Sequence, residues 1–173
     1  MTTDKYLMGS RAMGVSSELS DYDWVCLDDT LTGMTFQDGM INDHFKKGEH
    51  CYHFGYDYFE SIINFNTGEG DYCFLYNPMY FRVGLSNVNP FDMREKWVEK
   101  IKALDLNCNY FWFHHKDKPR KRMYWVVYNV YCLKENTLTP SDEAMALVQK
   151  FHDKESTTED FNNLLEEIKN LSA

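Results

Sequence analysis

A glycine–serine pair and two aspartates near the start of the chain carry the clearest chemistry in this sequence. Gly9 and Ser10 follow the short apolar run 6–8, and Asp21 and Asp23 open a second run that alternates over 21–27. Two acids at positions i and i+2 of a strand point to the same side, a few ångströms apart. Because Mg²⁺ prefers hard oxygen ligands, the pair is predicted to hold Mg²⁺ or Mn²⁺.

The Gly9-Ser10 pair complements such a metal site. A turn at glycine lets backbone amides and the Ser10 hydroxyl come close to phosphate oxygens, and Arg11 adds a further phosphate donor. A metal beside this turn would orient a triphosphate and neutralise charge on the attacking and leaving oxygens. The pattern therefore predicts a site for a metal-bound nucleoside triphosphate. The competing interpretation is that residues 20–23 only form a turn between two strands.

The stretch from Gly9 to Gly14, followed by Ser20-Asp21-Tyr22-Asp23, resembles the DNA-polymerase-β-type nucleotidyltransferase superfamily. A similar pattern, GSRA-x-G … SDYD, marks a group of predicted bacterial and phage nucleotidyltransferases. The resemblance implies an α+β fold, with a mixed twisted sheet, flanking helices and a helical C-terminal half. It also implies Mg²⁺-dependent transfer of a nucleoside monophosphate from a triphosphate to a hydroxyl acceptor, with pyrophosphate leaving. Gly9 and Ser10 would then contact the triphosphate.

The same resemblance implies a third acid on a later strand, and the chain departs from the superfamily there. The pattern places this position at His50, which is not an acid. Glu49 is adjacent, but a slip of one residue would turn it to the opposite face of a strand. Asp57 and Asp71 are other candidates. A neutral His50 is predicted to act as a base or a ligand.

This departure leaves two classes of function open. The first is a metal-dependent nucleotidyltransferase that modifies RNA, a protein or a small molecule. The alternative is a catalytically degenerate nucleotide-binding or protein-interaction module on the same fold. A metal-dependent hydrolase could also use paired aspartates, but it would not need the glycine–serine phosphate turn.

One basic segment, residues 116–122, stands out in an otherwise acidic chain with a net charge of −9. It is predicted either to contact the triphosphate or an RNA or protein acceptor, or to be a solvated loop before a helix. Lys121 is the residue expected to bind nucleotide, because it resembles a lysine that related proteins carry at the start of this helix. The aromatic run 110–113 could stack bases, although core packing is the simpler interpretation.

Histidine and cysteine gather in a second stretch. Four possible zinc ligands lie within ten residues: His44, His50, Cys51 and His53. Their spacing matches no common zinc motif, and strand alternation would place His50 and His53 on opposite faces. Half-buried or surface histidines are the alternative.

The elements that must position these residues run in the order strands first, helices later. Strands are expected over 6–8, 21–27 and 51–54, with a helix over 57–65 and a strand or buried run over 72–76. Asn89-Pro90, Thr139-Pro140 and the Ser156-x-x-Glu159 capping box predict three helix starts. The nearly continuous apolar run of 11 residues at 123–133 favours a buried helix over a strand. The expected organisation is a core over 1–88 and a helical region over 89–173 that packs on it.

Composition sets the remaining bounds. The chain has 173 residues, 43% of them hydrophobic, which is enough for a real core. No apolar stretch reaches about 18 residues, so no membrane segment is expected. The five cysteines are odd in number and scattered, which is typical of reduced thiols in a cytoplasmic protein.

Overall fold

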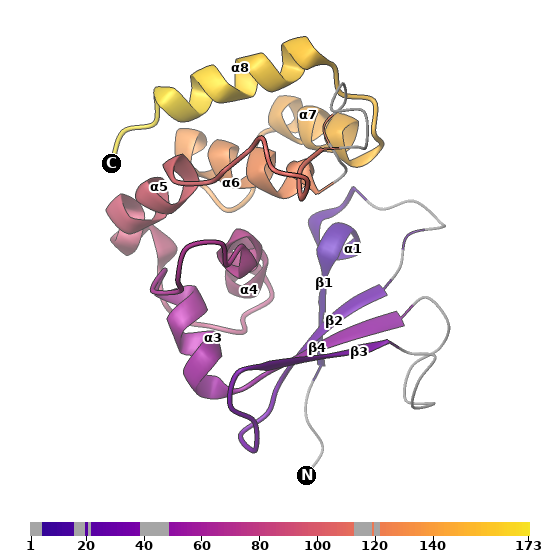
Figure 1. Ribbon diagram of the computed structural model, residues 1–173, viewed down its shortest axis with the longest axis vertical. Coiled ribbons are helices and arrows are strands. Elements are labelled where there is room, and N and C mark those ends of the chain that lie inside the picture. Colours follow the sequence, from indigo (N-terminus) through magenta and orange to yellow (C-terminus); the bar gives the residue numbers. More distant parts are fainter. Residues whose placement is uncertain (1–4, 16–19, 21, 39–48, 113–118, 120–121) are drawn as a thin grey trace. The chain divides into compact units, whose positions relative to one another are not determined.

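The computed structural model describes residues 5–15, 20, 22–38, 49–112, 119 and 122–173. The chain divides into two compact units, Met1–Val88 and Asn89–Ala173. The first contains a mixed sheet with helices, and the described elements of the second are helical, so the α+β class is confirmed (Figure 1). No helix among the described residues is both long and apolar enough to cross a membrane.

The sheet of the first unit has four strands in the order β1-β2-β4-β3. The strands are β1 (Lys5–Met8), β2 (Tyr22–Leu27), β3 (Met34–Asp38) and β4 (Glu49–Phe54). The central pair, β2 and β4, is parallel, while β1 and β3 run antiparallel to their neighbours. Side chains alternate along each strand, so Asp23 and Cys26 lie on opposite faces of β2. These faces are called the Asp23 face and the Cys26 face below.

Helices of the first unit cover the Asp23 face. They are α1 (Gly9–Met13), α3 (Tyr56–Ile63), a 3-10 turn at Cys73–Tyr76 (η1) and α4 (Asn77–Arg82). Figure 1 shows α3 and α4 on one side of the sheet. Phe54, in register with Leu27 on the Asp23 face, lies 6.3 Å from the rings of both Phe59 and Tyr80. All three rings are buried, so this aromatic cluster joins β4 to α3 and α4.

The region around residue 75 differs from its sequence-based prediction. A strand over 72–76 is wrong, although Phe74 and Leu75 form the buried part of the run. The segment is the η1 turn and continues directly into α4, because Pro78 fits the first turn of a helix. Asn77 donates from Nδ2 to the Ile62 carbonyl at 2.9 Å, which ties the start of α4 to the end of α3.

Helices build the described part of the second unit. They are a 3-10 turn at Pro90–Met93 (η2), α5 (Arg94–Lys102), α6 (Met123–Glu135), α7 (Asp142–His152) and α8 (Thr158–Lys169). Residues 123–130 of α6 are all buried, which confirms the predicted buried helix. Within this core, Asn129 Oδ1 accepts from Trp97 Nε1 at 2.9 Å, and Asn129 Nδ2 donates to the Trp125 carbonyl at 2.8 Å. The buried amide is thereby satisfied on both sides.

Two details of this unit refine the sequence-based expectations. Phe111 and Trp112 are buried, and Trp112 lies edge-on to Phe161 at 4.7 Å, so these two rings serve the core. The capping box of α8 is formed by Thr157 and Asp160, one residue beyond the predicted pair.

Candidate functional site

The turn after β1 places Gly9 and Ser10 at the start of α1. Gly9 has a φ of +70°, in the left-handed region that favours glycine. Ser10 is buried, and its carbonyl accepts from the amides of Gly14 and Val15, both at 3.0 Å, which closes the short helix. Strand, left-handed glycine and helix start therefore follow one another within a few residues.

Asp23 lies directly against this turn. It pairs with Met8 across the antiparallel β1–β2 ladder. A Cβ built on Gly9 would overlap Asp23 Oδ2 and would lie 3.2 Å from the Cβ and Cγ of that aspartate. The Asp23 carboxylate therefore occupies the space that a side chain at position 9 would need. Asp21, its predicted partner, lies outside the described residues.

His50 stands beside Asp23 on the neighbouring strand. The two residues are register partners in the parallel β2–β4 ladder, so they share the Asp23 face. Glu49 pairs with Tyr22 and lies on the opposite face. The row of paired Cα positions continues from His50 to Asp38 on β3. The structure therefore brings Gly9, Ser10, Asp23 and His50 together at one end of the sheet.

Arg11 reaches back toward the start of β2. Its Nε and Nη2 donate to the Ser20 carbonyl at 3.2 and 2.8 Å, and its Cζ lies 3.9 Å from the centre of the Tyr22 ring. These contacts bind α1 to the residues that enter β2. Arg11 thus helps to position the strand that carries Asp23.

Two further acids were candidates for the third carboxylate. Asp71 accepts from the Tyr58 hydroxyl and, at 2.9 Å, from the amide of Cys73. Burial and the Asp71 carboxylate raise the pKa of the Cys73 thiol to about 12. Asp57 is exposed in the first turn of α3. Neither acid belongs to the β2–β4 row that contains Asp23 and His50.

Most of the predicted basic segment, including Lys121, lies outside the described residues. Arg122 is described, and its Cζ lies 4.6 Å from the centre of the Tyr110 ring. This contact places a cation over an aromatic face immediately before α6.

The Cys26 face carries a group that sequence reasoning did not assemble. The Sγ atoms of Cys26 and Cys51 are 2.8 Å apart, and a ring nitrogen of His53 completes a set within 4.8 Å. The hydrogen bond between the thiols lowers the pKa of Cys26 and raises that of Cys51, so the pair retains one proton readily. Of the predicted zinc ligands, Cys51 and His53 belong to this set. His50 lies on the other face, and His44 lies outside the described residues.

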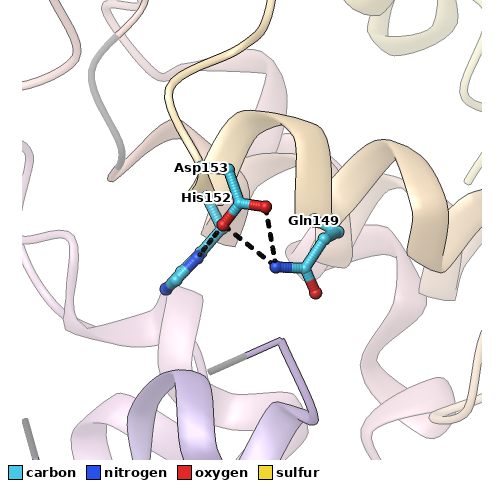
Figure 2. Close-up of polar contacts among 3 residues, drawn as sticks. All are labelled: Gln149, His152 and Asp153. Carbon is cyan, nitrogen blue, oxygen red and sulfur yellow. Dashed lines mark hydrogen bonds and ion pairs between the residues drawn. The ribbon is translucent and has the colours of Figure 1, made fainter. Parts of the chain in front are cut away.

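A separate polar cluster ends α7 in the second unit (Figure 2). The Asp153 carboxylate lies between two side chains, with His152 Nδ1 at 3.0 Å and Gln149 Nε2 at 3.0 and 3.1 Å. His152 is buried and meets the Tyr124 ring edge-on at 5.1 Å. A carboxylate at a helix C-terminus is disfavoured by the helix dipole, so the contacts from His152 and Gln149 offset the electrostatic free-energy cost of Asp153.

Comparison with protein-family models, with curated proteins and with solved structures finds no match to this chain. The chemistry of this chain is therefore inferred from the geometry of the two faces of the sheet. The Asp23 face joins a carboxylate and an imidazole to a glycine turn. The Cys26 face joins two thiols and an imidazole.

Proposed function

We propose that the first unit is a metal-dependent nucleotidyltransferase domain that binds a nucleoside triphosphate at the Gly9-Ser10 turn. The observation that supports this most directly is the approach of the Asp23 carboxylate to the backbone of Gly9. Phosphate groups bind where backbone amides are accessible, and a metal ligand must lie close by to neutralise their charge. Gly9 has no side chain, so the turn can expose its backbone amides, and the adjacent Asp23 carboxylate can serve as the metal ligand.

The donor set fits Mg²⁺ or Mn²⁺. Asp23 offers hard carboxylate oxygens, and in the sequence Asp21 precedes it at the i−2 position of the same run. When bound, the metal would supply charge neutralisation on the triphosphate. Ser10 and the amides after Gly9 would bind the phosphates, and Arg11 would keep the entry to β2 in place. Lys121 is proposed to contact the nucleotide, and the 116–122 segment an RNA or protein acceptor.

His50 places an imidazole where the superfamily pattern has a third carboxylate. An imidazole next to Asp23 cannot add the negative charge that a third carboxylate would bring. It can accept the proton of an attacking hydroxyl at a ring nitrogen, which is the role proposed for it in transfer. The acceptor hydroxyl would belong to RNA, a protein or a small molecule.

The position of His50 also supports a second candidate function. Losing one carboxylate weakens the site for the metal that activates the acceptor but leaves the phosphate turn intact. On this account the domain binds a metal–triphosphate complex but does not transfer the nucleoside monophosphate, and it acts as a nucleotide-binding or protein-interaction module.

One experiment separates the two functions. The reduced protein, consistent with a proposed cytoplasmic location, is incubated with each α-labelled nucleoside triphosphate, Mg²⁺ or Mn²⁺, and cellular RNA and protein. Asp23→Asn is the test variant, and Asp29→Asn, an exposed acid just beyond β2, is the matched control. Label transferred by the native protein and the control, but not by Asp23→Asn, supports the enzyme.

A further variant tests the missing carboxylate. His50→Asp restores an acid beside Asp23, and in a degenerate binder it should create or raise transfer by about tenfold or more, equivalent to about 1.4 kcal/mol of transition-state stabilisation. Metal-dependent triphosphate binding by calorimetry, without transfer by the native protein, supports the binding module. If neither the native protein nor His50→Asp binds any triphosphate, the nucleotide proposal fails.

A further inference from the structure

The parallel pairing of β2 and β4 builds a triangle of sulfur and nitrogen donors on the Cys26 face. Cys51 and His53 stand at i and i+2 of β4, so both point to the same face. Cys26 is the register partner of His53 on β2, and Cys51 pairs with Trp24 two residues earlier. The three donor atoms consequently lie within 4.8 Å of one another. This arrangement follows from the ladder itself and not from a flexible loop.

The donor types select a particular class of metal. Two thiolates and one imidazole are typical ligands of Zn²⁺, with Zn–S distances of about 2.3 Å and Zn–N distances of about 2.0–2.1 Å. In a tetrahedral site those bond lengths put two sulfurs roughly 3.8 Å apart. The observed Sγ–Sγ separation is 2.8 Å, so the sulfurs must move apart by about 1 Å, within reach of small side-chain rotations.

The surroundings suit a bound cation with one open position. Cys26 and Cys51 are buried, whereas His53 is only partly buried, so the cluster is closed on the sulfur side and open on the histidine side.

We propose that Cys26, Cys51 and His53 form a zinc-binding site on the Cys26 face of the sheet. Three protein ligands hold the ion, and a water molecule or an external ligand completes the tetrahedron. The ion joins β2 to β4, the two strands that carry Asp23 and His50 on the other face. This zinc site is independent of the proposed nucleotide site, because it uses soft ligands and the opposite side of the same strands.

The test is metal binding by the full chain, purified under reducing conditions without a metal-affinity tag. Zinc content is measured by mass spectrometry of the metal after dialysis, and affinity by competition with a chromogenic chelator. Co²⁺ replacement adds a spectroscopic readout, because thiolate coordination gives charge-transfer absorption. We expect one zinc per chain and a tetrahedral cobalt–thiolate spectrum.

Variants locate the ion. His53→Gln and Cys26→Ser should weaken zinc binding by at least about 10–100-fold, since even outer-shell changes cost that much. Cys108→Ser, which removes a half-exposed thiol of the second unit, should bind zinc like the native protein. His53 is partly exposed, so His53→Gln should retain its circular dichroism spectrum and remain informative if Cys26→Ser misfolds.

Three outcomes would overturn the proposal. The first is a native protein that takes up less than one equivalent of zinc at micromolar free metal. The second is undiminished zinc affinity in folded His53→Gln. The third is a Cys26–Cys51 disulfide, detected as a pair that resists alkylation after the protein, purified under reducing conditions, is denatured with a chelator, because oxidation would consume both sulfur ligands.

Discussion

Replacing Gly9 by alanine tests the close approach between the glycine turn and Asp23. The new Cβ would overlap Asp23 Oδ2 while the backbone keeps a φ of +70°. Gly14→Ala is the matched control, because Gly14 also has a positive φ, of +89°, but a Cβ there would meet nothing within 4 Å. Both variants change the unfolded chain in the same way, so that contribution cancels in the comparison.

The magnitudes follow from two separate costs. A left-handed backbone costs an L-residue about 1–2 kcal/mol, and this applies to both variants. Overpacking adds typically about 1–3 kcal/mol, and this applies to Gly9→Ala alone. We therefore expect Gly9→Ala to lose about 1–3 kcal/mol more unfolding free energy than Gly14→Ala in urea titrations. If Asp23 turns aside instead, the strain is released and metal-dependent triphosphate binding weakens.

A double-mutant cycle identifies the contact responsible. Asp23→Ala removes the overlapping carboxylate oxygen, so Gly9→Ala should cost less in that background, with a coupling energy of about 1 kcal/mol or more. If Gly9→Ala matches Gly14→Ala in both stability and triphosphate affinity, the proposed overlap between position 9 and Asp23 does not exist. Equal costs would mean that nothing but backbone conformation matters at position 9.

Three other perturbations have defined outcomes. Thr157→Ala removes the N-cap of α8 and should lower the unfolding free energy by about 1 kcal/mol, measured by urea titration. Asn129→Leu leaves the indole N–H of Trp97 without its acceptor and should cost about 1–3 kcal/mol in the same assay, whereas Asn163→Leu on the exposed side of α8 should cost far less. Cys73 has a pKa raised from 9.0 to about 12, so its native state holds the proton more tightly than the unfolded chain does. Its contribution to stability is complete below pH 9 and is lost as pH rises from 9 to 12, and Cys73→Ala should therefore show a shallower alkaline fall in unfolding free energy.

Local patterns predicted the elements whose signals lie within one segment. The nearly continuous apolar run of 11 residues before Lys134 is longer than a typical strand, and α6 is a buried helix. β3 was missed because its alternating pattern covers only residues 34–37 within a polar, glycine-containing segment, and its partner β4 follows later in the chain. The apolar run 72–76 fitted a strand by its composition, but Pro78 directly after it fits the first turn of α4, and the run leads into that helix.

The candidate site also has a part that local sequence patterns predicted and a part that depends on strand pairing. Sequence spacing selected Gly9, Ser10 and Asp23, and alternation correctly separated His50 from His53. The overlap between position 9 and Asp23 depends on the β1–β2 register, which no local pattern encodes. Cys26 was not grouped with Cys51 because the two are 25 residues apart and meet only through parallel pairing. Matching cysteine positions on two strands of the same alternation would have been the available signal.

The strand order also determines when the sheet can form. β4 follows β3 in the chain but lies between β2 and β3 in the sheet. The four-stranded sheet therefore cannot form until about a third of the chain has been synthesised. Before β4 inserts, β2 and β3 each present an unpaired edge that can recruit other chains. Parallel pairing at this sequence separation closes slowly compared with local helices. Folding of the first unit should therefore be limited by β4 insertion, and aggregation of nascent chains should peak just before residue 54 emerges from the ribosome.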